Sequence, residues 1–419
     1  MTVIRLAMQS LRNRWLTALL TVLAIAVSVM LLLGVEKIRN GARASFANTI
    51  SGTDLVVGAR SGGLQLLLYS VFRIGNATNE VTWRSYKDIA SRPEVAWTIP
   101  IALGDSHRGY RVLGTTNAYF KHYRFRDKQL LTLQAGRGGF HGLLDTVIGA
   151  DVARTLGYKI GDKIIVSHGL GEIGEKHDVL PFEITGILAK TGTPVDRTVH
   201  VSLEAIEAMH VDWHKGYKMP GQTTPLAKIL RMKFRPDEVT AAFIGLKSRL
   251  QAFKFQRFVN DYSKEPLTAV LPGVALHQLW SLVGTAERAL LLISVMVVIT
   301  AILGMITMIL ATLNERRREI AILRSVGAGP RTVVGLLVAE TSILTLAGVV
   351  LGVFSLYGLL IVARPAIDRA YGIYLEIGAP TQRELLALAA IILGGCLAGF
   401  VPAWRAYRLS LADGMMVRT

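Results

Sequence analysis

The stretch NERRREIAILRSVGAGPRTVV, residues 314–334, decides the fold of this chain. It places five arginines within residues 314–331, between two long segments without a charged residue, 289–313 and 341–363. Short basic loops between apolar segments are typical of the cytoplasmic side of membrane proteins, where lysine and arginine accumulate. We therefore interpret 314–331 as a cytoplasmic loop between two membrane-spanning helices.

Two further apolar segments, 15–35 and 385–403, also lack charged residues. A helix rises about 1.5 Å per residue, so each such segment can cross the roughly 30 Å hydrocarbon core of a bilayer. We predict four transmembrane helices, at 15–35, 289–313, 332–363 and 385–403. The first is longer than the apolar core of a signal peptide and no small-residue cleavage site follows it, so we expect an uncleaved anchor.

The arginines also orient the chain. Residues 1–14 and the tail 404–419 carry an excess of arginine, as does 314–331, whereas the short loop 364–384 balances its charges. Both termini are therefore expected in the cytoplasm, and 36–288 and the short loop in the periplasm of a bacterial inner membrane. Residues 1–14 also carry apolar residues at helical spacing on one face and polar residues on the other. This pattern predicts an amphipathic helix lying on the inner leaflet.

The predicted periplasmic domain, 36–288, mixes strands and helices. TDLVVGA (53–59) and YRVLGTT (110–116) are typical of strands, and TWRSYKDIASRP (82–93) of a helix ended by its proline. Short strands punctuated by glycine, proline and aspartate then predict a β-rich insert over about 140–225. The predicted fold class is an α-helical membrane protein with four transmembrane helices (1 + 3) and a large α+β extracytoplasmic domain containing a β-rich inserted subdomain.

The net charge of +17 does not indicate nucleic-acid binding. Residues 36–288 hold 33 basic and 23 acidic residues, dispersed and without a basic run, so most of the excess lies outside the cytoplasm. Such a distribution favours an anionic surface or partner on that side. The single cysteine, Cys396, lies in the last span, so no disulfide framework forms within one chain.

No motif for catalysis or nucleotide binding is present. The nearest match to a phosphate-binding loop, GLGEIGEK (169–176), has Glu175 where the lysine must stand, and a carboxylate there would repel phosphate. The motifs G-x-S-x-G and H-E-x-x-H do not occur. We predict a chain without catalytic residues that binds no ATP itself.

All nine histidines fall within 36–288. In HVDWH, residues 210–214, an extended backbone would direct His210, Asp212 and His214 to one side, as zinc ligands require. The alternative is that these loop histidines are only solvated. We do not expect zinc as a resident cofactor, and keep it as an alternative.

Two pairs of small residues stand within the predicted spans. Gly348 and Gly352 are four residues apart, as are Gly395 and Gly399, so each pair lies on one face of its helix. Small residues at this spacing let membrane helices approach closely. We predict helix packing at these glycines.

Several motifs now resemble one family. ERRREIAILRSVGAGPRTV (315–333) looks like the cytoplasmic loop of MacB/FtsX-type ABC permeases, and PAWRAYRLSLADGM (402–415) like the end of their membrane domain. VIGADVARTLGYKIGDKIIV (147–166) is similar to their periplasmic core domain. One span, a large outer domain and three spans is also their layout. The chain lacks the ATPase domain that is fused in MacB itself, as in permeases whose ATPase is a separate chain.

The resemblance implies that the basic loop is a coupling helix docked on a cytoplasmic ABC ATPase, which carries ATP and magnesium. The residues agree, because Ile320, Leu323 and Val326 form an apolar stripe that the positive-inside rule does not explain. Gly327 can end this helix and Pro330 can begin the next. The predicted coupling residues are Glu315, Arg316, Arg318, Glu319, Ile320, Leu323, Arg324 and Gly327.

The family further implies a second permease chain, as a homo- or heterodimer, and a periplasmic adaptor or substrate protein. The first hypothesis is a permease subunit that uses ATP hydrolysis to move its periplasmic domain mechanically, in efflux or lipoprotein and protein handling. The second is an FtsX-like transmembrane regulator that relays the state of the ATPase to a periplasmic partner. The third is a component of a zinc-linked transport system.

Overall fold

The structure is a computed structural model that describes residues 2–169, 180–214, 217–218, 224–315, 322, 325, 327–371 and 378–408. The chain divides into two compact units. The first, the helical unit, comprises Met1–Gly41, Gly284–Ala366 and Leu375–Thr419. The second, the sheet unit, comprises Ala42–Val283 and Ile367–Tyr374. Each unit is described by itself.

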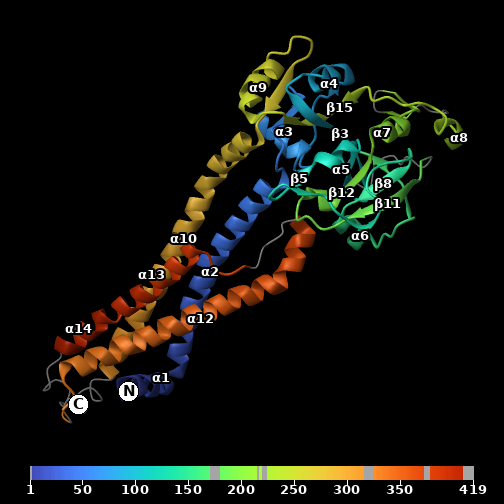
Figure 1. Cartoon of the computed structure of the whole chain (residues 1–419). Helices are drawn as coiled ribbons and strands as arrows, with labels where there is room; N and C mark the ends of the chain where they lie inside the picture. Colours follow the sequence, from blue (N-terminus) through green and yellow to red (C-terminus); the bar gives the residue numbers. More distant parts are fainter. Residues whose placement is uncertain are drawn as a thin grey trace. The chain divides into compact units, whose positions relative to one another are not determined.

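Long helices build the helical unit (Figure 1), and three of them have residues in both units. They are α1 (Thr2–Asn13), α2 (Trp15–Thr49), α10 (Pro272–Glu315), α12 (Pro330–Tyr371), α13 (Gln382–Ala398) and α14 (Phe400–Arg408). Among the residues that the structure describes, four stretches are long and apolar enough to cross a membrane: Trp15–Gly41, Gly284–Leu313, Arg331–Arg364 and Gln382–Ala406. The predicted fold class with four transmembrane helices is confirmed, and each predicted span lies within one of these stretches.

The ends of these helices follow from local sequence. Gly327 has a φ of +98°, a left-handed conformation that favours glycine, and α12 begins at Pro330. Thr381 caps α13 through a capping box, in which its hydroxyl accepts from the backbone of Glu384 and the glutamate accepts from the backbone of Thr381. Along the spans large apolar side chains such as Leu292 and Phe354 remain exposed, as lipid-facing residues are.

An eleven-stranded mixed sheet organises the sheet unit, in the order β17-β1-β16-β3-β4-β12-β8-β11-β7, with β10 paired to β3 and β9 to β11. The strands are β1 (Leu55–Ala59), β3 (Val95–His107), β4 (Tyr110–Thr115), β7 (Leu133–Gly136), β8 (Asp145–Ile148), β9 (Lys163–Ile164), β10 (Ser167–His168), β11 (Phe182–Leu188), β12 (Thr198–Ser202), β16 (Ala241–Leu246) and β17 (Leu267–Val270). Three short pairs stand apart: β2 (Val81–Thr82) with β15 (Glu238–Val239), β5 (Arg124–Phe125) with β6 (Gln129–Leu130), and β13 (Trp213–His214) with β14 (Tyr217–Lys218).

The predicted β-rich insert continues this sheet. Strand β12 pairs in parallel with β4, from Thr198 opposite Arg111 to Ser202 opposite Thr115. Strands β8, β11 and β7 then follow on the far side of β12. The α+β fold class is confirmed, and its β-rich part shares one sheet with the rest of the unit.

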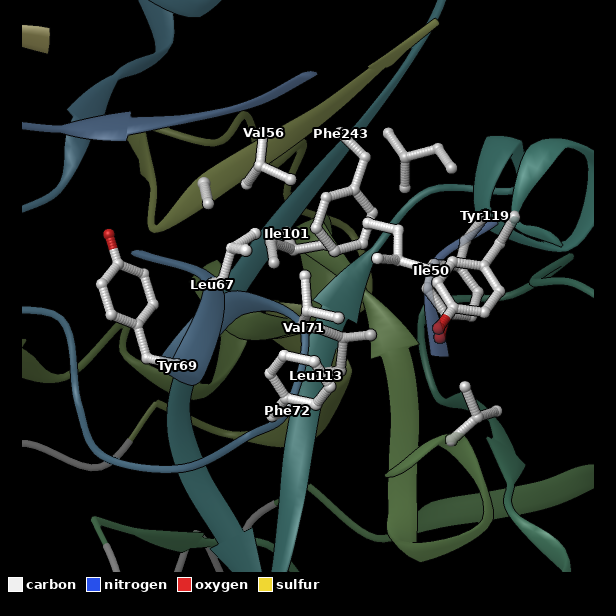
Figure 2. Close-up of a cluster of buried hydrophobic side chains, with 14 of the residues drawn as sticks. Ile50, Val56, Leu67, Tyr69, Val71, Phe72, Ile101, Leu113, Tyr119 and Phe243 are labelled. Carbon is white, nitrogen blue, oxygen red and sulfur yellow. The ribbon is translucent and has the colours of Figure 1, made fainter. Parts of the chain in front are cut away.

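Successive residues of a strand face opposite sides of the sheet. Both faces carry buried apolar residues, and helices pack on each of them. The helices of the unit are α3 (Gly63–Ser70), α4 (Trp83–Ala90), α5 (Ala118–His122), α6 (Ala150–Leu156), α7 (Leu203–Met209), α8 (Leu226–Ile229) and α9 (Ala252–Asn260). On one face Val56 and Phe243 pack with Leu67 of α3 and Tyr119 of α5 (Figure 2). On the other face the neighbouring strand residues pack with α4 and α9.

The sheet unit also buries polar side chains. His200 on β12 is fully buried, and its Nδ1 lies 3.0 Å from the carbonyl oxygen of Val147. Burial lowers the pKa of His200 to about 3, so this imidazole is neutral at physiological pH. His107 is buried too, with its two ring nitrogens against the carbonyl of Ile165 and the hydroxyl of Tyr158. Neither residue is one of the loop histidines for which solvation was the alternative.

Candidate functional site

The predicted coupling loop lies between α10 and α12. Glu315 is the last residue of α10, and Gly327 and Pro330 stand at the start of α12 as described above. The other predicted coupling residues lie outside the described residues: Arg316, Arg318, Glu319, Ile320, Leu323 and Arg324. The coupling helix therefore stays a prediction.

The first glycine pair lies at a contact between α12 and α2. A Cβ added to Gly348 would stand 2.7 Å from the Cβ of Ile25, and one added to Gly352 would stand 2.6 Å from the carbonyl oxygen of Ala26. Neither contact leaves room for a side chain. Backbones approach this closely only where small residues face the partner helix.

The second pair lies where α13 crosses α12. A Cβ on Gly395 would stand 2.1 Å from Oγ1 of Thr345, and one on Gly399 would stand 2.3 Å from Oγ1 of Thr341. Helix α12 therefore contacts α2 at its own Gly348 and Gly352. It contacts α13 at Gly395 and the adjoining Gly399. This places α12 at the centre of the contacts among these three helices.

An ion pair that we did not predict joins α2 to the start of α13. Nζ of Lys37 lies 3.3 Å from Oε2 of Glu384, and its distances to the carbonyl oxygens of Gly378 and Ala379 are 3.3 and 3.4 Å. The hydroxyl of Tyr357 on α12 donates to the same Gly378 carbonyl at 2.9 Å. Three helices thus meet at one polar cluster.

The histidine-rich segment 210–214 is not extended throughout. His210 caps the C-terminus of α7, residues 211–212 form a turn, and β13 begins at Trp213. Both carboxylate oxygens of Asp212 accept hydrogen bonds from Thr224, from its backbone N–H at 2.7 Å and its hydroxyl at 2.6 Å. The side chain of His214 lies outside the described part of the chain.

The structure brings His210 together with a different pair of residues. Nε2 of His210 lies 3.1 Å from Nδ1 of His168 and 3.7 Å from Oδ1 of Asp105. Nδ1 of His168 is 3.1 Å from the same carboxylate oxygen. Asp105 is only 2% exposed. We name Asp105, His168 and His210 the aspartate–histidine cluster.

Comparison with known proteins defines the class as an ABC transporter permease. A family model of the MacB-like periplasmic core domain matches residues 18–241, and one of the FtsX-like permease C-terminal region matches residues 291–411. The chain belongs to the MacB/FtsX-type permease family, whose members are typically non-catalytic membrane subunits. No curated protein matches the chain.

The chain is similar to several solved structures, including these two. The extracellular domain of the noncanonic ABC-type transporter YknZ from Gram-positive bacteria is 14% identical, with 52% of this chain and 98% of that domain covered and a TM-score of 0.30. The periplasmic region of MacB from Actinobacillus actinomycetemcomitans is 9% identical, with 55% of this chain and 94% of that region covered and a TM-score of 0.33.

Proposed function

We propose that this chain is the membrane subunit of an ABC-type complex that turns ATP hydrolysis on a separate cytoplasmic ATPase into movement of its periplasmic domain. The continuity of two helices carries the proposal. Helix α2 contains the span Trp15–Gly41 and continues to Thr49, and α10 starts at Pro272 although its span starts at Gly284. Both α2 and α10 therefore have residues in the helical unit and in the sheet unit.

Helical continuity matters because coupling between distant sites needs elements that move as units. A helix keeps all its backbone hydrogen bonds internal, so it bends sharply only where proline, glycine pairs or an inserted group interrupts them. Helix α10 ends at Glu315, directly before the basic loop. A displacement of that loop would be passed along α10 to its beginning at Pro272.

The remaining assignments follow the family. The complex would contain a second permease chain and an ABC ATPase. The ATPase would bind ATP and magnesium itself and would dock on the basic loop. It would lie in a bacterial inner membrane with both termini in the cytoplasm. The periplasmic domain would act on a periplasmic or membrane-associated substrate, in efflux or in handling lipoproteins and other proteins.

The test compares an apolar with a charged position of the predicted coupling helix. Leu323→Asp puts a charge at the centre of the proposed contact, where truncation of a buried anchor costs about 2 kcal/mol or more. Arg317→Ala removes one arginine of several, and exposed ion pairs contribute little. We expect Leu323→Asp to uncouple ATPase activity from the permease and Arg317→Ala to stay near the wild type.

The measurements are ATPase activity of the purified complex and co-purification of the two subunits, with membrane insertion of each variant checked first. A Leu323→Asp complex that hydrolyses ATP and co-purifies like the wild type would refute the coupling assignment. The basic loop would then be a positive-inside flank only.

A further inference from the structure

Three elements of the sheet unit bring the aspartate–histidine cluster together. Asp105 is on β3, His168 on β10, and His210 at the end of α7. Strand β10 pairs with β3 so that His168 stands directly opposite Asp105. The three donor atoms, one from each residue, all lie within 4.8 Å of one another.

A β-bulge directs the aspartate into this position. The pairing of β3 with β4 shifts register between Leu103 and Ser106, so β3 holds one more residue there than its partner does. Bulges re-aim side chains and occur often beside functional sites. Asp105 lies within this bulge and is buried.

The hydrogen bond on the far side of the His210 ring selects its tautomer. Nδ1 of His210 lies 2.8 Å from the carbonyl oxygen of Ile206, so this nitrogen carries the proton and donates it. In the neutral ring, Nε2 then presents a lone pair to His168 and Asp105. Metal-binding histidines are typically oriented in this way, with the second ring nitrogen donating to a backbone carbonyl.

We propose that the aspartate–histidine cluster binds a divalent transition-metal ion, with zinc as the ion of best fit. A tetrahedral zinc ion with bonds of about 2.0–2.1 Å holds its ligand atoms roughly 3.3 Å apart. The observed separations of the three donor atoms are 3.1, 3.1 and 3.7 Å. Two imidazoles and one carboxylate are a ligand set that zinc favours and that calcium and magnesium do not.

Hydrogen bonds among these three residues explain the short distances between their donor atoms less well than a shared metal ion does. A neutral His168 has one N–H to offer, and if Nδ1 carries it, Nε2 of His210 and Oδ1 of Asp105 compete for the same proton. One divalent cation would accept a lone pair from all three atoms.

The surroundings suit a bound ion. The ring of Trp213 lies 4.6 Å from that of His168 and 5.7 Å from that of His210, measured between centroids. An apolar wall of this kind limits solvent access to a metal. The ion would fasten β10 and the end of α7 to the central strand β3, and so stiffen this part of the periplasmic domain. This proposal does not depend on the ATPase-coupling assignment.

The test uses the full chain in detergent, freed of metal by chelation and carrying no histidine tag. Zinc affinity is measured by competition with a chromophoric chelator, and cobalt is titrated to follow its visible absorption, which reports tetrahedral coordination. We expect one ion per chain at micromolar affinity or tighter, and a rise in melting temperature with zinc. His168→Gln and His210→Gln keep a polar side chain for folding, and each should weaken binding by about 100-fold or more.

Two controls discriminate the cluster from other sites. His277→Gln removes an exposed histidine of α10 and should leave zinc affinity unchanged. Asp212→Asn should also leave it unchanged, whereas Asp105→Asn should weaken it. Absence of zinc and cobalt binding by the wild type, or equal affinity in the wild type and both glutamine variants, overturns the proposal. So does loss of binding in Asp212→Asn with retention in Asp105→Asn.

Discussion

Nζ of Lys37 lies 3.3 Å from Oε2 of Glu384, and this ion pair joins α2 to the first turn of α13. The lysine side chain is 12% exposed and the glutamate side chain 1%, so the pair is largely withdrawn from solvent. Oε2 of Glu384 also accepts from the backbone N–H of Thr381 at 2.8 Å. The pair therefore holds the capped start of α13 to the first spanning helix.

Lys37→Met should destabilise the helical unit strongly. The substitution leaves a buried carboxylate without its cation, a change that typically costs about 3–5 kcal/mol. Adding Glu384→Gln to the same chain removes the stranded charge and should recover most of the loss. The measurement is thermal unfolding in detergent micelles, followed by tryptophan fluorescence.

The control for this prediction is Lys264→Met, which breaks the pair with Asp88. That pair is exposed, with side chains 57% and 39% accessible, so its loss should change the melting temperature little. Similar losses for Lys37→Met and Lys264→Met would show that the buried pair does not hold α13.

Gly352→Leu should separate α12 from α2. Its new Cβ would stand 2.6 Å from the carbonyl oxygen of Ala26 and 2.9 Å from the Cβ of Val29, so the helices must move apart. Overpacking of this kind typically costs about 1–3 kcal/mol. Gly358→Leu on the same helix is the matched control, because no neighbouring atom lies within 4 Å of its Cβ. Equal melting temperatures for the two variants would contradict the close approach at Gly352.

Sequence patterns predicted the parts of this structure that depend on neighbouring residues. Span length, charge at the span ends and helix caps are all local, so the four spans and the helix start at Pro330 could be predicted. Strands and helices of the sheet unit were predicted for the same reason at Leu55–Ala59, Trp83–Ala90 and Tyr110–Thr115.

The polar sites depend on contacts that no local pattern contains. Asp105 and His168 stand 63 positions apart and meet because β10 pairs with β3. Lys37 and Glu384 are separated by nearly the whole chain. The alternation in HVDWH indicated His210 as a candidate metal ligand. Asp212, however, lies in the turn after α7, and its carboxylate accepts hydrogen bonds from Thr224. Only the presence of charged residues beside spans and of histidines beside glycine-rich loops could have marked these positions in advance.

Reporter fusions test the predicted topology. The arginine excess of the 314–331 loop and the even number of predicted spans predict that residue 325 lies in the cytoplasm and residue 150 in the periplasm. A phosphatase fused at 150 should be active and one fused at 325 inactive, and a cytoplasmic fluorescent reporter should give the reverse. The same compartment at both sites would refute the orientation.

Glu80 gives the sheet unit a pH dependence that runs opposite to that of ordinary carboxylates. Burial, followed by the hydrogen bond to Glu238, raises the pKa of Glu80 to about 8, and the hydroxyl of Thr240 lies 3.3 Å from its Oε1. The folded state therefore binds a proton that the unfolded state releases near pH 4.5. This contribution to stability is complete below pH 4.5 and is lost as the pH rises to about 8.

Glu80→Gln replaces the protonated carboxyl by a neutral amide that does not titrate. The free energy of unfolding of this variant, relative to that of the wild type, should rise between pH 5 and pH 8 by an amount on the order of a few kcal/mol and level off above pH 8. The melting temperature of the variant relative to the wild type should follow the same course. Glu183→Gln, at an exposed position of β11, is the matched control for the removal of a carboxylate. A Glu80→Gln difference that is the same at pH 5 and pH 9 would show that Glu80 is ionised at neutral pH in the folded protein.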